Sequence, residues 1–289
     1  MKIQVILSCD DESEGRFYEF WPLANYSYQR AFSAQGASVV VTLVYISKTH
    51  SFVDFSQNVV KFPRIEGIPS GNQAKVSRMF YASQLGLYPD TMDDIVLLGD
   101  IDMVPMNCSK LLESLEKIPN KKQVFPYFVS YGSNAFSNTP NETKYPMCYF
   151  SGRARDFSRV VNPGFLNYTD WLHQFKTPEF LSSCIDKKEC IDLPPERFSD
   201  ESLLRIFLIK HNAIVNNIHR PTMDPQRIKP GCILPYIDRV DRSTQGFTGI
   251  GDIIVVGDKE FAVDCHMLRP FVLSRPRYKW LFDSIGFEI

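Results

Sequence analysis

The amino-acid sequence predicts an α/β fold in which a mostly parallel central sheet is flanked by helices. Two patterns indicate this fold. Strand-like and helical segments alternate through the first hundred residues, and the segment from Ile95 to Leu98 is apolar without a helical period. Such alternation is typical of a parallel sheet, and a continuous apolar strand is typical of its buried centre. No internal repeat, low-complexity tract or linker divides the chain, so we expect one domain over residues 1–289.

The elements expected up to residue 100 have the clearest signals. Apolar residues at helical spacing mark two helices, and Gly36 and Gly86 follow them where glycine often ends a helix. Segments rich in Val, Ile and Tyr mark the strands. In chain order we expect strand Lys2–Ser8, helix Phe17–Gln35, strand Ser38–Ile46, strand Val59–Ile65, helix Gly71–Leu85 and a strand that begins at Asp94.

The pattern after residue 102 is looser. Ser199 can cap a helix over Ser199–His211, whose apolar stripe comprises Leu203, Leu204, Phe207 and Leu208. A loop rich in Ser, Asn and Gly, Tyr131–Pro146, could cover a site. The other expected elements are helix Cys108–Lys117, strands Gln123–Val129 and Met147–Phe150, helix Trp171–Phe175, a hairpin of Ile253–Val256 and Phe261–Val263 joined through Gly257–Asp258, and helix Tyr278–Ser284.

Composition and charge narrow the classes of function. With 32 Lys and Arg against 33 Asp and Glu, the net charge of -1 gives no electrostatic reason to expect nucleic acid or an anionic membrane surface as a partner. No apolar run reaches the length of a membrane span, and the N-terminus resembles a first strand rather than a secretion signal. Seven cysteines without C-x-x-C spacing indicate neither a disulfide framework nor a structural zinc site. We therefore expect a cytoplasmic protein, with a lumenal catalytic domain of a secretory-pathway enzyme as the alternative.

Two aspartates, Asp100 and Asp102, follow the apolar strand that begins at Asp94. In an extended segment residues i and i+2 point to the same side, so the two carboxylates face one spot. In the crevice at the carboxyl end of a parallel strand they would repel each other without a cation between them. A Mg²⁺ or Mn²⁺ ion that carries phosphates is the expected occupant, since both ions prefer oxygen ligands. The alternative is an ordinary strand followed by an Asx-rich turn.

Polar residues at the end of the first predicted strand would reach the same crevice. These residues are Ser8, Asp10 and Asp11. Loops at the carboxyl ends of strands line the ligand crevice of an open α/β sheet, so a carboxylate there could bind a ribose hydroxyl or a base edge. The alternative is a solvated acidic turn.

Two cations, Lys75 and Arg78, lie one turn apart on the predicted helix before the Asp-x-Asp strand. A guanidinium that reaches the crevice would suit a nucleotide or its phosphates, because it donates several hydrogen bonds in a fixed planar geometry. The alternative is a pair of ordinary cations on a helix surface.

The acid pair Asp200 and Glu201 begins the predicted helix at Ser199. Carboxylates in a first turn gain about 0.3–1 kcal/mol from the helix dipole, which is a sufficient structural reason for them. The functional reading makes one of them a general base, a nucleophile or an electrostatic partner at a reacting sugar carbon.

The last candidate is the segment from Val263 to Phe271, in which His266 leaves a predicted strand close to Arg269. A neutral imidazole can complete a metal site begun by two carboxylates. The alternative is a histidine without a ligand role.

The order of these features along the chain resembles metal-dependent glycosyltransferases of the GT-A fold. The resemblance is to the branch of glycogenin and the bacterial lipooligosaccharide galactosyltransferases. In that branch an Ala-Asp-Asp-like loop follows the first strand, an arginine precedes a hydrophobic strand ending in Asp-x-Asp, and an acidic pair precedes a later helix. The family's closing motif, His-x-x-Gly-x-Lys-Pro-Trp, is matched only partly by His266–Phe271, which lacks the glycine, is two residues shorter, and has Arg269 and Phe271 for Lys and Trp.

The resemblance implies a role for each matching position. Residues 1–106 would form the half that binds a nucleotide sugar, and residues 107–289 the acceptor side. Asp100, Asp102 and His266 would bind Mn²⁺ or Mg²⁺, and Asp200 or Glu201 would be the catalytic carboxylate. The donor, a UDP-sugar by expectation, would contact Ser8, Asp10, Asp11, Lys75, Arg78, Asp100 and Arg269. The acceptor would be a glycan or another hydroxyl compound.

Two other functions stay open at this point. Haloacid-dehalogenase-like phosphatases also carry Asp-x-Asp after an apolar strand and would use Asp100 and Asp102, but their motif usually follows the first strand. A GT-A-like domain that binds a nucleotide or glycan without turnover is the non-enzymatic alternative. The sequence does not decide the donor sugar and base, the acceptor, the stereochemistry or the oligomeric state.

Overall fold

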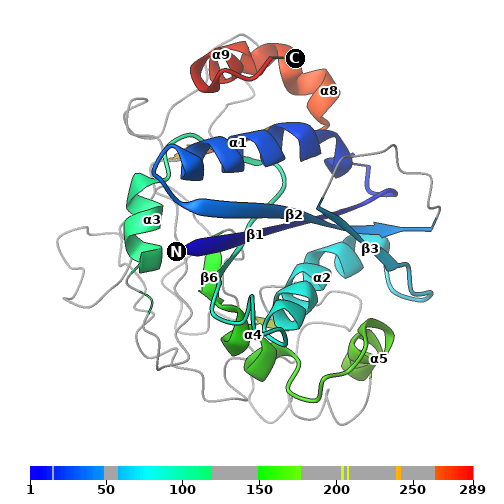
Figure 1. Ribbon diagram of the computed structural model, residues 1–289. Helices are drawn as coiled ribbons and strands as arrows, with labels where there is room; N and C mark the ends of the chain where they lie inside the picture. Colours follow the sequence, from blue (N-terminus) through cyan, green and yellow to red (C-terminus); the bar gives the residue numbers. More distant parts are fainter. Residues whose placement is uncertain are drawn as a thin grey trace, which may run out of the picture.

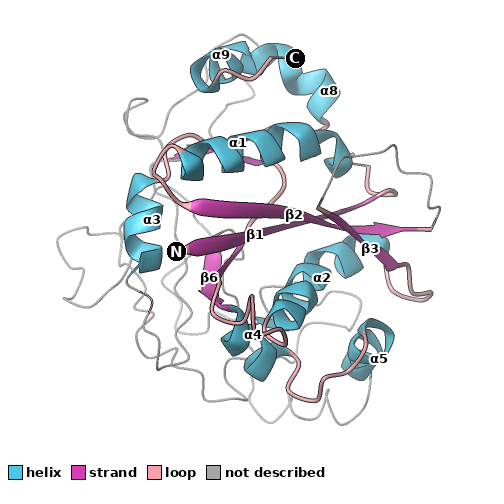
Figure 2. Cartoon of the chain, viewed as in Figure 1, coloured by secondary structure: helices cyan, strands magenta, loops and turns pink. Residues whose placement is uncertain are grey.

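The computed structural model describes residues 1–14, 16–48, 58–116, 118, 149–176, 203, 204, 207, 239–241 and 264–288 of the chain. In this part of the chain the strands form two sheets, one of five strands and one of three. Helices cover the five-stranded sheet on both faces (Figures 1 and 2).

The larger sheet is mostly parallel, with the strand order β3-β2-β1-β4-β6. Strand β1 pairs in parallel with β2 and β4, and β2 pairs in parallel with β3. Among the described strands of this sheet only β6, at the edge, runs antiparallel, next to β4. The predicted fold class is therefore confirmed. The strands are β1 (Lys2–Asp10), β2 (Ser38–Ser47), β3 (Val59–Pro63), β4 (Ile95–Leu98) and β6 (Phe150–Arg153).

The sheet separates two hydrophobic clusters. Helix α1 (Trp21–Ser33), preceded by the 3-10 turn η1 (Phe17–Phe20), covers one face, and α2 (Ser70–Leu85) and α4 (Ala154–Val161) cover the other (Figure 1). Because successive strand residues point to opposite faces, β1 sends Ile3, Val5 and Leu7 to the first cluster and Ile6 to the second. Burial on both faces explains why the central strands show no polar alternation.

The C-terminal residues return to the first half of the chain. A three-stranded sheet has the order β5-β8-β7, and its register places Met103 opposite His266. The segment after the Asp-x-Asp strand therefore pairs with the C-terminal motif. The other elements are β5 (Met103–Pro105), α3 (Ser109–Glu116), α5 (Tyr168–His173), η2 (Gln174–Lys176), β7 (Arg239–Asp241), β8 (Asp264–His266), α8 (Phe271–Ser274), η7 (Arg275–Tyr278) and α9 (Lys279–Ile285).

The predicted elements that fall in the described residues are confirmed, with differences at their ends. The strand predicted over Met147–Phe150 is instead β6, from Phe150 to Arg153, and β5, α4, β7 and α8 were not predicted. Three residues of the Ser199–His211 stripe, Leu203, Leu204 and Phe207, are buried as expected. The predicted strand Gln123–Val129, loop Tyr131–Pro146 and both hairpin strands lie outside the described residues.

Two further expectations bear on the described residues. No helix among them is long and apolar enough to cross a membrane. Cys9, Cys108 and Cys265 are buried. Burial raises the pKa of Cys9 well above its ordinary value, and the neighbouring charges of Asp10 and Asp11 raise it further. Cys9 is therefore held in the neutral thiol form.

Candidate functional site

The candidate site lies where the strand order of the larger sheet reverses. Strand β1 has β2 on one side and β4 on the other, so the chain first moves outward to β3 and then returns to the opposite side of β1. Ligands of open α/β sheets bind in the crevice at such a switch point, outside the carboxyl ends of the strands. Asp10 ends β1, and Gly99 and Asp100 directly follow β4. The two predicted acidic segments therefore meet at one edge of the sheet.

The acid loop after β1 presents two buried carboxylate oxygens without a hydrogen-bond partner among the described residues. Asp10 is 1% exposed, and its Oδ1 accepts a hydrogen bond from the Ser13 amide at 3.3 Å. Asp11 accepts one from Ser47 Oγ at 2.7 Å through its Oδ2. Asp10 Oδ2 and Asp11 Oδ1 are the oxygens left over. An unsatisfied buried acceptor costs free energy, so these two positions favour a ligand that donates hydrogen bonds.

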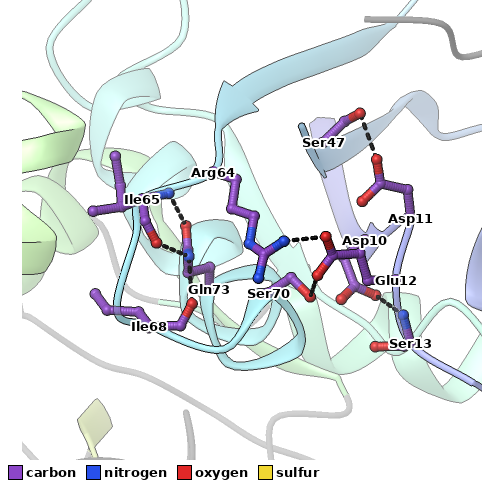
Figure 3. Close-up of polar contacts among 10 residues, drawn as sticks. All are labelled: Asp10, Asp11, Glu12, Ser13, Ser47, Arg64, Ile65, Ile68, Ser70 and Gln73. Carbon is purple, nitrogen blue, oxygen red and sulfur yellow. Dashed lines mark hydrogen bonds and ion pairs between the residues drawn. The ribbon is translucent and has the colours of Figure 1, made fainter. Parts of the chain in front are cut away.

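The acid loop is tied to the turn between β3 and α2 (Figure 3). Glu12 forms an ion pair with Arg64 and accepts a hydrogen bond from Ser70 Oγ at 3.3 Å. Gly71, the next residue of α2, lies against this loop: a Cβ at Gly71 would be 3.1 Å from Ser13 Oγ and 3.8 Å from Asp10 Oδ2. Asp10 thus lies close to the N-terminus of α2, where the helix dipole favours negative charge.

A single buried amide, Gln73, fixes the shape of that turn. Its Nε2 donates to the carbonyl oxygens of Ile65 and Ile68 at 2.7 and 2.8 Å, and its Oε1 accepts from the Ile65 amide at 2.9 Å. The side chain therefore satisfies three backbone groups in the turn that carries Arg64 and Ser70 (Figure 3).

Arg78 reaches the crevice at the Asp-x-Asp segment, but from a buried position rather than from the helix surface. Its side chain is 4% exposed, and Nη1 donates to the Gly99 carbonyl at 2.5 Å and to Asp100 Oδ1 at 2.8 Å. Lys75, one turn earlier on α2, is exposed. The structure therefore distinguishes the two cations: Arg78 positions Asp100, whereas Lys75 lies on the surface.

Asp102 is enclosed by the C-terminal motif. It is 1% exposed; its Oδ2 accepts a hydrogen bond from Arg269 Nε at 2.6 Å and lies 3.4 Å from His266 Nε2. The pairing of β5 with β8 and a hydrogen bond from the Met267 amide to the Asp102 carbonyl hold the segments together. The guanidinium of Arg269 also lies over the ring of Phe17, 4.3 Å from its centroid. The predicted proximity of His266 and Asp102 is thus present.

The predicted metal ligands suit Mn²⁺ or Mg²⁺ in their chemistry, because two carboxylates and an imidazole are acceptable donors to both ions. Asp102 and His266 lie together, whereas Asp100 is hydrogen-bonded to Arg78. Among the described residues no three His, Cys, Asp or Glu side chains are positioned to hold a metal ion. The assignment of a metal to Asp100, Asp102 and His266 therefore stays a prediction.

The other predicted site residues are placed as follows. Ser8 is half-buried in β1, opposite Val44 of β2. Asp200 and Glu201 lie outside the described residues. Close to them in the chain, Leu203 and Leu204 are completely buried. The role of the acid pair stays a prediction.

Sequence reasoning missed several residues that build the site, among them Phe17, Ser47, Arg64 and Gln73. A signal was available for Ser47, because it ends the strand next to β1 and must lie at the same edge of the sheet. The contacts of Arg64 and Gln73 depend on the path of the turn between β3 and α2, which residue spacing does not determine.

Comparisons with known proteins add similarities of fold. No protein-family model matches the sequence, and no curated protein matches it significantly. Similar solved structures include the galactosyltransferase LgtC in complex with donor and acceptor sugar analogues (9% identity, TM-score 0.42, covering 99% of this chain and 95% of that one). They also include mouse xyloside xylosyltransferase 1 (10% identity, TM-score 0.40, covering 92% of this chain and 97% of that one). A third is 4-diphosphocytidyl-2C-methyl-D-erythritol synthase (12% identity, TM-score 0.37, covering 61% of this chain and 85% of that one). At these identities and TM-scores the similarity by itself assigns no activity.

Proposed function

We propose that this chain is a metal-dependent glycosyltransferase of the GT-A type, which moves a sugar from a nucleotide sugar to a hydroxyl acceptor. The observation that carries the proposal is the convergence of two acidic segments at the switch point between β1 and β4. One segment, at Asp10 and Asp11, offers buried acceptor oxygens to a ligand, and the other is an Asp-x-Asp. A nucleotide diphosphate needs both chemistries, since its nucleoside donates hydrogen bonds and its diphosphate binds cations.

The phosphatase alternative is not favoured by the position of the Asp-x-Asp. The motif follows β4, after three parallel strands and two helices, whereas the phosphatases in question carry it after their first strand. Strand β1 here ends instead at Asp10, and Asp11 follows it. Ser13 donates a hydrogen bond to Asp10, and Ser47 donates one to Asp11. The non-catalytic alternative is a GT-A-like domain that binds the same kind of ligand. Only a measurement of turnover distinguishes it from the proposed enzyme.

Each segment of the site would have a distinct role. Asp10 Oδ2 and Asp11 Oδ1 would accept hydrogen bonds from the nucleoside, with uridine as the proposed base. Ser8, in the same strand as Asp10, would also contact the donor. Arg78 and Arg269 are the cations of the Asp-x-Asp segment and would stabilise negative charge that develops on the leaving nucleoside diphosphate. Lys75 is exposed, so its proposed contact would be with an outer part of the donor.

Asp100, Asp102 and His266 would hold the Mn²⁺ or Mg²⁺ ion. When bound, the ion supplies Lewis-acid stabilisation of the donor diphosphate. The protein's own contribution is positional: β5 and β8 bring His266 to Asp102, and Arg78 fixes Asp100 at the end of β4. Asp200 or Glu201 would act on the acceptor side, as the base that takes the hydroxyl proton in an inverting reaction. In a retaining reaction the same position would face the donor sugar.

The test is binding and turnover with a panel of nucleotide sugars. We expect UDP with Mn²⁺ to raise the melting temperature of the protein, since a ligand at 100 times its Kd stabilises the folded state by about 2.7 kcal/mol. EDTA should abolish the part of this increase that depends on the metal. Release of UDP from UDP-sugars with a hydroxyl acceptor measures turnover. No stabilisation by any nucleotide sugar would contradict the proposal, and binding without turnover would favour the non-catalytic alternative.

The variant Asp102→Asn tests the metal assignment within this proposal. Mn²⁺-dependent transfer should be lost, because the amide is a poorer metal ligand than the carboxylate. Burial of Asp102 between Arg269 and His266 means that the substitution also lowers stability, so transfer is compared at a temperature where the variant is folded. Near wild-type turnover with saturating donor would show that Asp102 does not bind the metal.

A further inference from the structure

Helix α8 exposes two adjacent aliphatic side chains. Val272 is 53% exposed and Leu273 is 75% exposed, whereas Phe271 before them and Ser274 after them are buried. A soluble protein exposes scattered apolar residues without consequence, but two neighbours on one helix form a small continuous apolar surface. We call Val272, Leu273, Arg275 and Arg277 the C-terminal edge.

The exposure of these side chains is fixed by packing on both sides of them. The ring of Phe271 packs against Phe20, with centroids 5.1 Å apart. Ser274 Oγ donates to the Leu268 carbonyl at 2.8 Å. The Val272 amide donates to a Glu19 carboxylate oxygen at 3.2 Å, so the helix is anchored to η1 at the point where its apolar side chains point outward. Val272 and Leu273 therefore cannot turn inward without unpacking Phe271.

Cations follow the apolar pair directly. Arg277 is exposed and Arg275 is half-buried, and in the part of the chain that the structure describes neither forms an ion pair. Lys279, two residues later, is bound to Asp283 at 2.9 Å. From Arg269 to Glu288 the sequence carries four cations and two acids, although the chain as a whole has a net charge of -1. With Arg269 bonded to Asp102 and Lys279 to Asp283, Arg275 and Arg277 are the cations that the edge can offer to a partner.

A second exposed apolar pair among the described residues has a different charge environment. Leu87 and Tyr88, in the turn after α2, are 40% and 57% exposed. The residues that follow them are acidic: Asp90, Asp93 and Asp94. Two of these acids are paired, Asp93 with Arg155 and Asp94 with Lys2, so this second pair has no unpaired cations after it as Val272 and Leu273 have.

We propose that the C-terminal edge docks this protein on an anionic lipid surface. Aliphatic side chains that enter the boundary between headgroups and acyl chains, with arginines beside them at the level of the lipid phosphates, are the elements of an interfacial membrane contact. An acidic protein surface would pair with the arginines but would not bury the side chains of Val272 and Leu273. The edge is independent of the proposed chemistry, so this proposal holds or fails separately from the glycosyltransferase assignment.

The C-terminal edge lies close to the candidate site in the fold. Helix α8 begins two residues after Arg269, whose side chain is bonded to Asp102, and α8 lies beside α1 at the same side of the sheet (Figure 1). Docking through α8 would therefore bring the crevice close to the lipid surface. If the proposed function is correct, this places acceptors that are attached to lipids within reach.

The test is co-sedimentation of the full chain with vesicles. We expect binding to vesicles that contain about 30% phosphatidylglycerol, little binding to neutral phosphatidylcholine vesicles, and loss of binding as salt rises from about 0.1 M to about 0.5 M. The double variant Val272→Ser with Leu273→Ser should lower the partition coefficient on the order of tenfold, because the aliphatic groups no longer leave water. Arg275→Gln with Arg277→Gln should lower it about fivefold per charge.

The matched control is Leu87→Ser with Tyr88→Ser, which removes another exposed apolar pair, one that is not followed by unpaired arginines, and should leave vesicle binding unchanged. Circular dichroism and thermal unfolding verify that each variant is folded. Equal binding to neutral and anionic vesicles, or an equal loss in the control variant, would overturn the proposal. Concentration-dependent dimerisation that is lost in the Val272 and Leu273 variant, without vesicle binding, would assign the edge to self-association instead.

Discussion

Arg269 binds Asp102 across 167 positions of sequence, through a hydrogen bond of 2.6 Å from Nε to Oδ2. Arg78 binds the other carboxylate of the Asp-x-Asp, that of Asp100, at 2.8 Å. Each aspartate therefore has an arginine partner of its own. In the proposed enzyme a metal ion would have to share Asp102 with Arg269 or replace it there, and this competition can be measured without any turnover.

The variant Arg269→Gln should bind Mn²⁺ more tightly than the wild-type protein, because the cation that competes for Asp102 is gone. Without metal the variant should be less stable by about 2–3 kcal/mol, since Asp102 keeps a buried charge without its main partner, a cost reduced by the partial exposure of Arg269. Saturating Mn²⁺ should recover a larger part of the melting temperature in the variant than it adds to the wild type.

Arg275→Gln is the matched control, since it removes a guanidinium six residues away that has no ion pair in the described structure. Isothermal titration with Mn²⁺ and thermal unfolding with and without the ion give the two measurements. Equal Mn²⁺ affinity in Arg269→Gln and the wild type would show that Arg269 and a metal do not compete for Asp102.

Gln73→Leu should destabilise the protein by about 2–4 kcal/mol, because leucine has a similar volume but leaves three backbone groups of the β3–α2 turn without a partner. The same variant should bind nucleotides more weakly, since the turn carries Arg64 and Ser70, which hold Glu12 of the acid loop. Urea unfolding measures the first effect and nucleotide titration the second. Lys75→Ala, on the exposed face of α2, is the control for stability and should change it by less than about 0.5 kcal/mol.

Asp156→Asn should stabilise the protein at neutral pH and not at low pH. Burial raises the pKa of Asp156, while Arg155, Arg159 and Arg153 act in the opposite direction. A carboxyl group with a raised pKa binds its proton more tightly in the folded state, so its favourable contribution is present below the pKa of the unfolded chain. That contribution is lost as the pH rises through the pKa of the folded state.

The asparagine variant does not titrate, so its advantage over the wild type should grow between pH 4 and pH 7. Urea unfolding at several pH values measures the difference. An advantage that is constant with pH would mean that the proton on Asp156 contributes nothing to folding.

The part of the site that could be predicted from the sequence is the part built on strand ends. Asp10, Asp11 and Asp100 were placed at one edge because parallel strands end together, and the pairing of β1 with β2 and β4 confirms that edge. The segment after Asp102 shows the limit of this reasoning. Strand β5 has three residues, too few for a period, and its partner β8 lies 160 residues later. A pairing that depends on so distant a segment leaves no local signal.

Helix α4 was missed although its signal was present. Ala154, Phe157, Val160 and Val161 are buried at helical spacing, and they pack against the same cluster as α2. Gly86 shows how closely the two helices approach: a Cβ there would lie 2.3 Å from the Ala154 carbonyl oxygen. For Arg78 the sequence signal was used, but it did not indicate the environment of the side chain. Its approach to the crevice was predicted, but its contact with Asp100 and its burial were not, because spacing alone placed it off the apolar stripe of α2.

The last prediction concerns Asp200 and Glu201, which precede the buried residues Leu203 and Leu204. Neighbouring residues on a helix point about 100° apart, so only one of the two carboxylates can face a reacting carbon. An acid in a first turn contributes no more than about 1 kcal/mol through the helix dipole, whereas the loss of a general base slows turnover by roughly 10²–10⁴-fold. We therefore expect one of Asp200→Asn and Glu201→Gln to be nearly inactive while it still binds donor and Mn²⁺, and the other to be mildly affected. Asp200 is the expected sensitive position. Turnover measured beside nucleotide binding separates the two roles, and full activity in both variants would place the catalytic carboxylate elsewhere in the chain.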